Sequence, residues 1–186
     1  MRYSAFSGIR NAGDMQLKVV PHDVAWAEAF RREAGVVRVA LGENATAVHH
    51  IGSTAIAGIY AKPVIDLLPV VREIEAVDRS AAAMEAAGYE ALGEFGIAGR
   101  RYFRKGNAEG VRTHHVHVFA EGSEEVTRHV AFRDYLRAHA ERAAEYSELK
   151  RRLAAAHADD IEAYMDGKDA FIKQVEREAL AWARGR

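Results

Sequence analysis

The stretch "HHIGSTAIAGIYAKPVIDLLPVV", residues 49–71, decides the fold. A β-rich run at 46–51 ends at Gly52-Ser53, and small residues follow it. The run at 64–71 is nearly all apolar, which is typical of a central strand covered on both faces. Pro69 cannot donate a ladder hydrogen bond, so we expect this strand to bend or lose a neighbour there. Two strands joined by a small-residue turn are therefore predicted, with one acid inside the second.

The flanking sequence supplies helices and a hairpin. Predicted elements are a short strand at 16–20, a helix within 22–41 with Asp23 as N-cap, a helix within 72–88, hairpin strands at 100–105 and 111–119, and helices at 124–139, 141–157 and 159–184. This order predicts an α+β fold, in which helices flank a small mixed sheet and a C-terminal helical tail follows. We expect a leader at 1–15, a core at 16–122, and a helical segment at 123–186 packed on that core as one unit.

Composition excludes several classes of protein. The chain of 186 residues has 26 Lys and Arg against 27 Asp and Glu, so it lacks the net basic field of a non-specific nucleic-acid binder. It has no cysteine, which excludes disulfides, thiolate nucleophiles and cysteine-ligated metals. No apolar run is long enough for a membrane span or a secretory signal. We therefore expect a cytoplasmic protein without a membrane partner.

The Gly52-Ser53 pair is a candidate phosphate-binding turn. Glycine lets the backbone turn sharply and approach a ligand closely, because no Cβ intervenes. Ser53 or Thr54 can then cap a short helix, whose free N–H groups attract phosphate. The alternative is an ordinary strand-to-helix turn that binds no ligand, since short Gly-Ser motifs are common.

Asp66 is a candidate metal ligand. A carboxylate inside a buried strand is costly unless it is paired or metal-bound, and carboxylates hold Mg²⁺ in phosphoryl and nucleotidyl transfer. A two-metal site would place a second acid on the same strand face, at position 68, but Leu68 stands there. The alternative is that Asp66 caps a neighbouring loop or pairs with an arginine.

The segment "RTHHVHVF" supplies imidazoles that can complete the site. Alternation along a strand puts His115 and His117 on one face, where both can bind one ion and form a two-histidine, one-carboxylate set with Asp66. Imidazole suits Zn, Mn, Fe or Ni better than Mg. Core histidines bonded to a carboxylate, or acid–base and phosphate-contacting roles, are the alternatives.

Basic side chains near these motifs are candidate phosphate ligands. Lys62 follows the turn, and on the hairpin Arg101 shares a strand face with Lys105 while Arg100 shares the other with Arg104. We predict phosphate contacts from Lys62, Arg101 and Arg104. Exposed arginines that protect an edge strand from aggregation are the alternative.

The motifs together resemble the GrpB-like family. The matching stretches are "HIGSTAIAGIYAKPVIDLL" (50–68), "RRYFRK" with "THHVHV" (100–118), and "HVAFRDYLR", "YSELKRRLAAAH" and "YMDGKDAFI" in the tail. That family is placed in the nucleotidyltransferase superfamily, which shares the fold of the catalytic domain of DNA polymerase beta. Superfamily members transfer a nucleoside monophosphate from an NTP with the help of divalent metal.

Carried over by motif, the resemblance implies that Gly52 and Ser53 contact the triphosphate and that Asp66 holds metal. The absence of an acid at Leu68 is shared by GrpB-like chains. The leading hypothesis is a nucleotidyltransferase-like enzyme using Mg or Mn, or else Zn, with an NTP and an unknown small acceptor. Asp66, His115 and His117 would then be the catalytic and metal-binding residues, and Lys150 and Lys168 either reach the nucleotide or are structural.

Two other classes of function fit the same residues. A non-catalytic module could keep the pocket to sense a nucleotide or metal, with the helical tail forming a homodimer. A metal-dependent hydrolase could use the His-His-Asp set.

Overall fold

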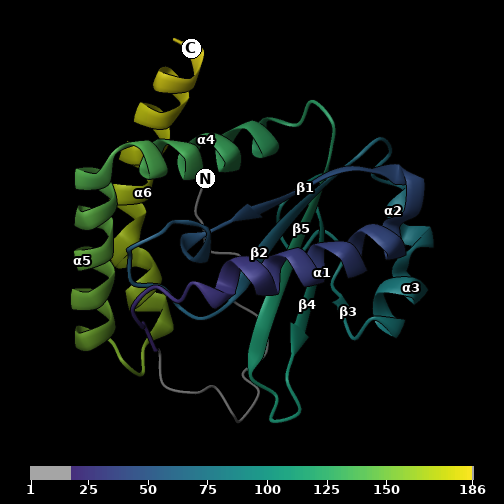
Figure 1. Cartoon of the computed structure of the whole chain (residues 1–186), viewed down its shortest axis with the longest axis horizontal. Helices are drawn as coiled ribbons and strands as arrows, with labels where there is room; N and C mark the ends of the chain where they lie inside the picture. The colour runs from purple at the N-terminus through teal and green to yellow at the C-terminus, as the bar shows by residue number, and fades with distance from the viewer. Residues whose placement is uncertain (1–17, 186) are drawn as a thin grey trace.

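A five-stranded mixed sheet in the order β1-β2-β5-β4-β3 forms the centre of the computed structural model, which describes residues 18–185 (Figure 1). The strands are β1 (Ala45–Ile51), β2 (Ile65–Val71), β3 (Glu90–Ala91), β4 (Arg101–Gly106) and β5 (Arg112–Ala120). β2 pairs antiparallel with β1 and parallel with β5, and β5 and β3 both pair antiparallel with β4. The central position of β2 explains its nearly continuous apolar sequence.

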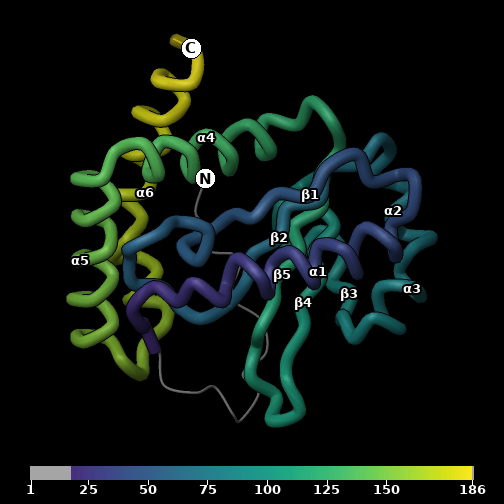
Figure 2. The backbone as a smooth tube through the Cα atoms, in the orientation of Figure 1, coloured from purple at the N-terminus to yellow at the C-terminus, as the bar shows by residue number. Residues whose placement is uncertain are grey.

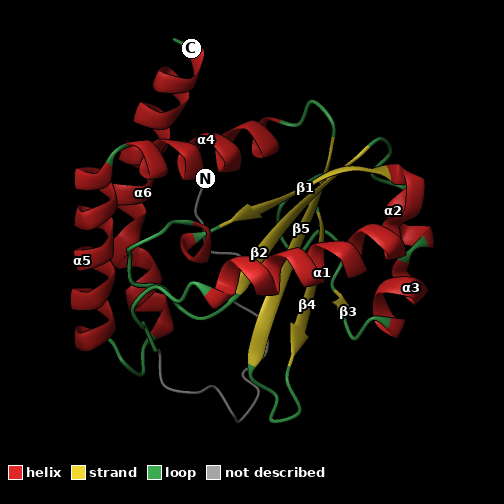
Figure 3. Ribbon diagram, in the orientation of Figure 1, coloured by secondary structure: helices red, strands yellow, loops and turns green. Residues whose placement is uncertain are grey.

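Helices lie on both faces of the sheet and beyond both of its ends (Figure 3). The helices are α1 (Ala25–Leu41), α2 (Ala76–Arg79), α3 (Ala81–Ala86), α4 (Glu124–Ala138), α5 (Ala140–Ala156) and α6 (Ile161–Arg184). Short 3-10 turns at Gly42–Asn44 and Ser53–Ala55 flank β1. The tube in Figure 2 shows α1 crossing one face of the sheet, α2 and α3 beyond one end, and α5 and α6 side by side beyond the other.

The two faces of the sheet bury different clusters. On one face, α1 and α3 pack through Trp26, Val37, Leu41 and Met84 against Ile65, Leu67, Val116, Val118 and Phe103. On the other face, Ile51, Leu68 and Phe119 pack with Val126 and Val130 of α4. Alternation along β2 therefore places Asp66 on the α4 side, with Leu68 next to it in the apolar core.

A third cluster joins the helical tail to the loop between β1 and β2. Ile56 and Ile59 of that loop are almost fully buried among Leu136, Tyr146 and Val175 of the three C-terminal helices. The loop that follows Gly52-Ser53 is thus held by residues more than seventy positions later in the chain.

The predicted α+β class, with a small mixed sheet flanked by helices and a C-terminal helical tail, is confirmed. The strands at 46–51 and 64–71, the hairpin and the helix breaks near His139 and Ala158 agree with the observed elements to within a few residues. The N-cap of α1 is Val24, one residue after the predicted Asp23, whose side chain accepts a hydrogen bond from the Ala25 backbone N–H at 2.8 Å. The paired positions of β2 and β5 pass from Leu67↔Val116 to Val70↔Phe119, which is the interruption that Pro69 predicts.

Two local predictions were wrong. The single helix predicted within 72–88 is two short helices, because Ser80 adopts φ −88° and ψ 0°, at the edge of the helical region, where its backbone ends one helix and begins the other. The predicted strand at 16–20 is reduced to a single bridge between Val20 and Ala61, and residues 16 and 17 lie outside the described residues, as does the predicted leader.

No helix within residues 18–185 combines the length and the apolar character that crossing a bilayer requires.

Candidate metal and phosphate site

The turn after β1 brings backbone and carboxylate into contact. Gly52 has φ 69° and ψ −175°, a conformation essentially reserved for glycine. A Cβ at this position would lie 2.3 Å from Oδ2 of Asp66, so only glycine lets the turn approach the carboxylate this closely. The predicted glycine turn therefore lies directly against the predicted acid.

The predicted side-chain cap of the turn was wrong. The 3-10 turn Ser53–Ala55 has Gly52 at its N-cap and no side-chain cap hydrogen bond. Thr54 is buried, and its hydroxyl lies 3.0 Å from Nε2 of His50 and donates to the Val64 carbonyl oxygen at 3.2 Å. These two bonds use the hydroxyl inside the core, so Thr54 stabilises the turn.

Asp66, His115 and His117 converge, as the alternation along the strands predicts. Asp66 and His115 are register partners across the parallel pair β2–β5. Asp66 Oδ1 lies 3.2 Å from Nδ1 of His115 and 3.7 Å from Nε2 of His117. One ligand atom from each of the three residues falls within 4.8 Å of the others, a spacing that fits a single ion bound by all three.

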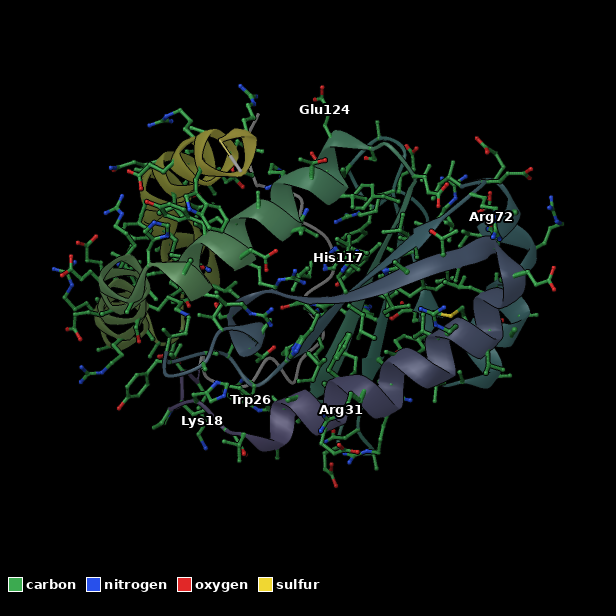
Figure 4. The ribbon with its side chains drawn as sticks, turned by 45° about the horizontal axis from the view of Figure 1, so that its top comes forward. Lys18, Trp26, Arg31, Arg72, His117 and Glu124 are labelled. Carbon is green, nitrogen blue, oxygen red and sulfur yellow. The ribbon has the colours of Figure 1, made fainter. Side chains whose placement is uncertain are left out.

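The surroundings of Asp66 favour its ionised form. Burial acts to raise the pKa of Asp66, but hydrogen bonds from His115 and His117 outweigh burial, and the pKa lies well below its usual range. Burial lowers the pKa of His117. The set therefore offers one carboxylate and neutral imidazole at physiological pH, which are the protonation states that metal binding requires. In Figure 4, His117 lies between α4 and the strands of the sheet.

The C-terminal helices bring an aromatic and cationic wall to the Gly52-Ser53 turn. Tyr146 of α5 is buried and shares a hydrogen bond with Ser53, and burial raises the pKa of the Tyr146 hydroxyl to about 12. Lys150, one turn later, donates to the Tyr60 carbonyl oxygen, and its Nζ lies 4.3 Å from the centroid of the Tyr146 ring. The sequence left open whether Lys150 reaches the nucleotide or is structural, and it did not predict Tyr146 as part of the site.

Two buried lysines, Lys150 and Lys168, stand in this wall, and neither forms an ion pair with a carboxylate of residues 18–185. Burial and the charge of Lys168 lower the pKa of Lys150 to about 7. Burial and the charge of Lys62 lower the pKa of Lys168 to about 8, which the negative charge of Asp66 partly offsets. Nζ of Lys168 lies 4.2 Å from the centroid of the Tyr164 ring. Buried lysines with lowered pKa values are costly in free energy and cluster at functional sites, so Lys150 and Lys168 are candidate anion-binding residues.

Two predicted phosphate ligands are instead engaged in ion pairs. Arg101 forms paired hydrogen bonds with both carboxylate oxygens of Asp78, on the α1 side of the sheet. Arg104 does the same with Glu90 of β3. Arg101 therefore lies on the opposite face of the sheet from Asp66, whereas Arg104 is the register partner of His115 and lies on the same face as the candidate site. Lys62 lies near Lys168.

Arg100, which was not among the predicted site residues, lies at the back of the site. Its side chain is buried, and one guanidinium nitrogen lies 3.4 Å from Nδ1 of His117. The strand register could have revealed this contact, because Tyr102 pairs with His117 and positions 100 and 102 share a face.

Two arginines of α4 donate hydrogen bonds to the backbone on either side of the turn. Arg133 donates to the His50 carbonyl oxygen at 3.0 Å, and Arg137 donates to the Ala55 carbonyl oxygen at 2.9 Å. These carbonyls lie immediately before and after the Gly52-Ser53 turn. The helical tail therefore positions the turn as well as forming one wall of the site.

Comparisons with known proteins point to one family. The family model described as GrpB protein matches residues 16–178. The UPF0157 protein YqkA of Bacillus subtilis is 47% identical over 92% of this chain, which spans only 49% of that protein. The UPF0157 protein PA4798 of Pseudomonas aeruginosa is 39% identical over 96% of this chain and 75% of its own length.

A solved structure supports the same assignment. The conserved protein GrpB from Enterococcus faecalis superposes with a TM-score of 0.85 at 48% identity, over 89% of this chain and 99% of that chain. The Cid1 poly(U) polymerase with bound MgGTP has a TM-score of 0.48 at 12% identity, a likeness too weak to bear on function.

Proposed function

The chain belongs to the GrpB family, as its motifs predict, and we propose that it is a metal-dependent nucleotidyltransferase-like enzyme. It would transfer a nucleoside monophosphate from an NTP to a small acceptor. One observation carries the proposal: a carboxylate with two imidazoles lies against a glycine turn, and two buried lysines of the C-terminal helices lie nearby. Lys150 bonds to the Tyr60 carbonyl oxygen of the loop that follows the turn, and Lys168 is close enough to Asp66 for their charges to interact. Metal ligands beside a polyanion site are what NTP chemistry needs.

The residues divide into two groups by what they would bind. Asp66, His115 and His117 would hold one divalent cation, which supplies Lewis-acid stabilisation of charge on the phosphate oxygens. Lys150 and Lys168 would carry the positive charge that faces the remaining phosphates, and the Gly52-Ser53 turn offers backbone N–H groups at close range. Two imidazoles with one carboxylate favour Mn²⁺ or Zn²⁺ over Mg²⁺.

A non-catalytic nucleotide sensor is the second candidate. Leu68, where a second acid would serve a two-metal reaction, is fully buried with Ile51 and Phe119. The site can therefore bind a metal and a polyphosphate without the second metal that phosphoryl transfer often uses. Release of pyrophosphate from an NTP, tested with several small acceptors, separates the enzyme from the sensor.

Replacing Lys150 with methionine tests the polyphosphate half of the site. We expect wild-type protein to gain thermal stability with Mn²⁺ and ATP, and Lys150→Met to lose at least tenfold in affinity, about 1.4 kcal/mol of that ligand stabilisation. Without ligand the variant should differ little in stability from wild type, because removal of the buried charge is offset by loss of the hydrogen bond to the Tyr60 carbonyl oxygen.

Lys173→Met is the matched control, since Lys173 lies on α6 in an exposed pair with Asp169. It should leave the ligand shift unchanged. If no NTP, with or without Mn²⁺, Mg²⁺ or Zn²⁺, stabilises the wild-type protein, the proposed function is wrong.

Polyphosphate binding should take up protons at pH 8. In the ligand-free protein the pKa of Lys150 is about 7 and that of Lys168 about 8, so at pH 8 Lys150 is mostly neutral. A bound polyanion raises both pKa values, because it favours the charged forms. Affinity should therefore be highest below pH 7 and fall as pH rises above it. Calorimetry with ATP in two buffers of different ionisation enthalpy measures the uptake. Lys150→Met should reduce it, and equal uptake by both proteins would contradict the role of Lys150.

A further inference from the structure

Arg100 contacts the one nitrogen of His117 that does not face Asp66. The side chain is 5% exposed and is fixed by hydrogen bonds from Nε to the Glu94 carbonyl oxygen and from one terminal nitrogen to the Phe95 carbonyl oxygen. Its other terminal nitrogen lies 3.4 Å from Nδ1 of His117, and the guanidinium carbon lies 4.8 Å from the centroid of the Tyr102 ring. This anchoring leaves the guanidinium little freedom to turn away from the imidazole.

The contact decides which nitrogen of His117 carries the proton. A guanidinium has donors only, so Nδ1 of His117 must accept, and the imidazole proton then stands on Nε2. Nε2 faces Oδ1 of Asp66 at 3.7 Å, and Nδ1 of His115 faces the same oxygen at 3.2 Å. In the metal-free protein both imidazoles therefore point an N–H at the carboxylate.

Metal binding needs the opposite tautomer of His117. The nitrogen that faces Asp66 must give its lone pair to the metal, which moves the proton to Nδ1 and sets that N–H against the guanidinium of Arg100. Metal-ligating histidines normally donate this outer N–H to a carboxylate, a carbonyl oxygen or water. A fixed cation at that position has the wrong polarity for this bond.

We propose, on the basis of the proposed metal site, that Arg100 is a positioning residue that weakens binding of a free divalent cation to Asp66, His115 and His117. It does so by holding His117 in the Nε2–H tautomer. The site accordingly takes its metal together with a polyphosphate, whose oxygens add ligands, and does not hold a metal firmly by itself.

Arg100→Gln tests this role, because a glutamine carbonyl oxygen, directly or through a water, can accept the outer N–H. We expect the affinity of the ligand-free protein for Zn²⁺ and Mn²⁺ to rise about tenfold, measured by competition with a chromophoric chelator. Arg101→Gln is the matched control. It makes the same change one residue later on the opposite face, where Arg101 pairs with Asp78, and should leave metal affinity unchanged. Arg100→Lys keeps a donor and should bind metal no more tightly than wild type.

Nitrogen-15 shifts of His117 in the metal-free wild-type protein give a readout that needs no variant. They should show Nδ1 unprotonated and Nε2 protonated, and a protonated Nδ1 would overturn the proposal even if Arg100→Gln failed to fold. Unchanged metal affinity in folded Arg100→Gln would contradict the role of Arg100 alone. Absence of metal binding by wild type and every variant would overturn the metal site of the proposed function as well.

Discussion

Asp66→Asn should abolish metal-dependent stabilisation, with a loss of about 100-fold or more in affinity for Mn²⁺ or Zn²⁺. Asp66 is the only carboxylate among the three candidate ligands within residues 18–185, and an amide oxygen is a far weaker ligand for a divalent cation than a carboxylate. The change keeps the shape of the side chain and an oxygen that can accept hydrogen bonds from His115 and His117. The fold should therefore survive.

The measurement is thermal or urea unfolding with and without each metal, since a ligand bound only by the native state stabilises it in proportion to its affinity. Asp78→Asn serves as the control, because Asp78 pairs with Arg101 on the far face of the sheet. It should retain the full metal effect. Equal metal affinity in Asp66→Asn and wild type would remove Asp66 from the site.

Gly52→Ala should destabilise the protein by about 2–4 kcal/mol and weaken metal binding as well. The added methyl group would lie 2.3 Å from Oδ2 of Asp66 and 3.0 Å from its Cγ, distances that force the turn or the carboxylate to move. The φ of 69° adds backbone strain for any L-residue. Both effects act on the same contact, so stability and metal affinity should fall together.

Gly58→Ala separates these two effects. Gly58 has φ 77°, but a Cβ there would meet nothing within 4 Å. Its substitution should cost only the backbone strain, on the order of 1 kcal/mol, and leave metal affinity intact. If urea unfolding gave the same loss for both variants, the close approach of Gly52 to Asp66 would not matter to the fold.

The central strand β2 could be predicted from its nearly continuous apolar sequence, and the hairpin strands from side chains that alternate on a two-residue period. The same alternation placed His115 and His117 on one face, and the parallel pairing of β2 with β5 then brought both to Asp66. The short strand at Glu90–Ala91 escaped prediction because two residues carry no period. The break at Ser80 escaped because tertiary packing, which buries both Val77 and Met84, overrides the helical pattern.

The contacts made by long side chains could not be predicted from local patterns. Arg101 and Arg104 look alike in the sequence, yet they lie on opposite faces of the sheet, and each pairs with a carboxylate contributed by a different element. Lys150 bonds to the Tyr60 carbonyl oxygen and Tyr146 lies next to Ser53, each from about ninety residues later in the chain. Only the three-dimensional arrangement shows which cations lie near the carboxylate.

Arg133 and Arg137 of α4 donate hydrogen bonds to the His50 and Ala55 carbonyl oxygens, and these bonds also limit how the protein can be cut into smaller folded fragments. A fragment ending after β5 would keep all three candidate metal ligands. It would nevertheless lose both restraints on the loop that carries Gly52, together with the covering of Ile56 and Ile59. We therefore expect the sheet and the three C-terminal helices to fold together, and neither part to fold stably alone.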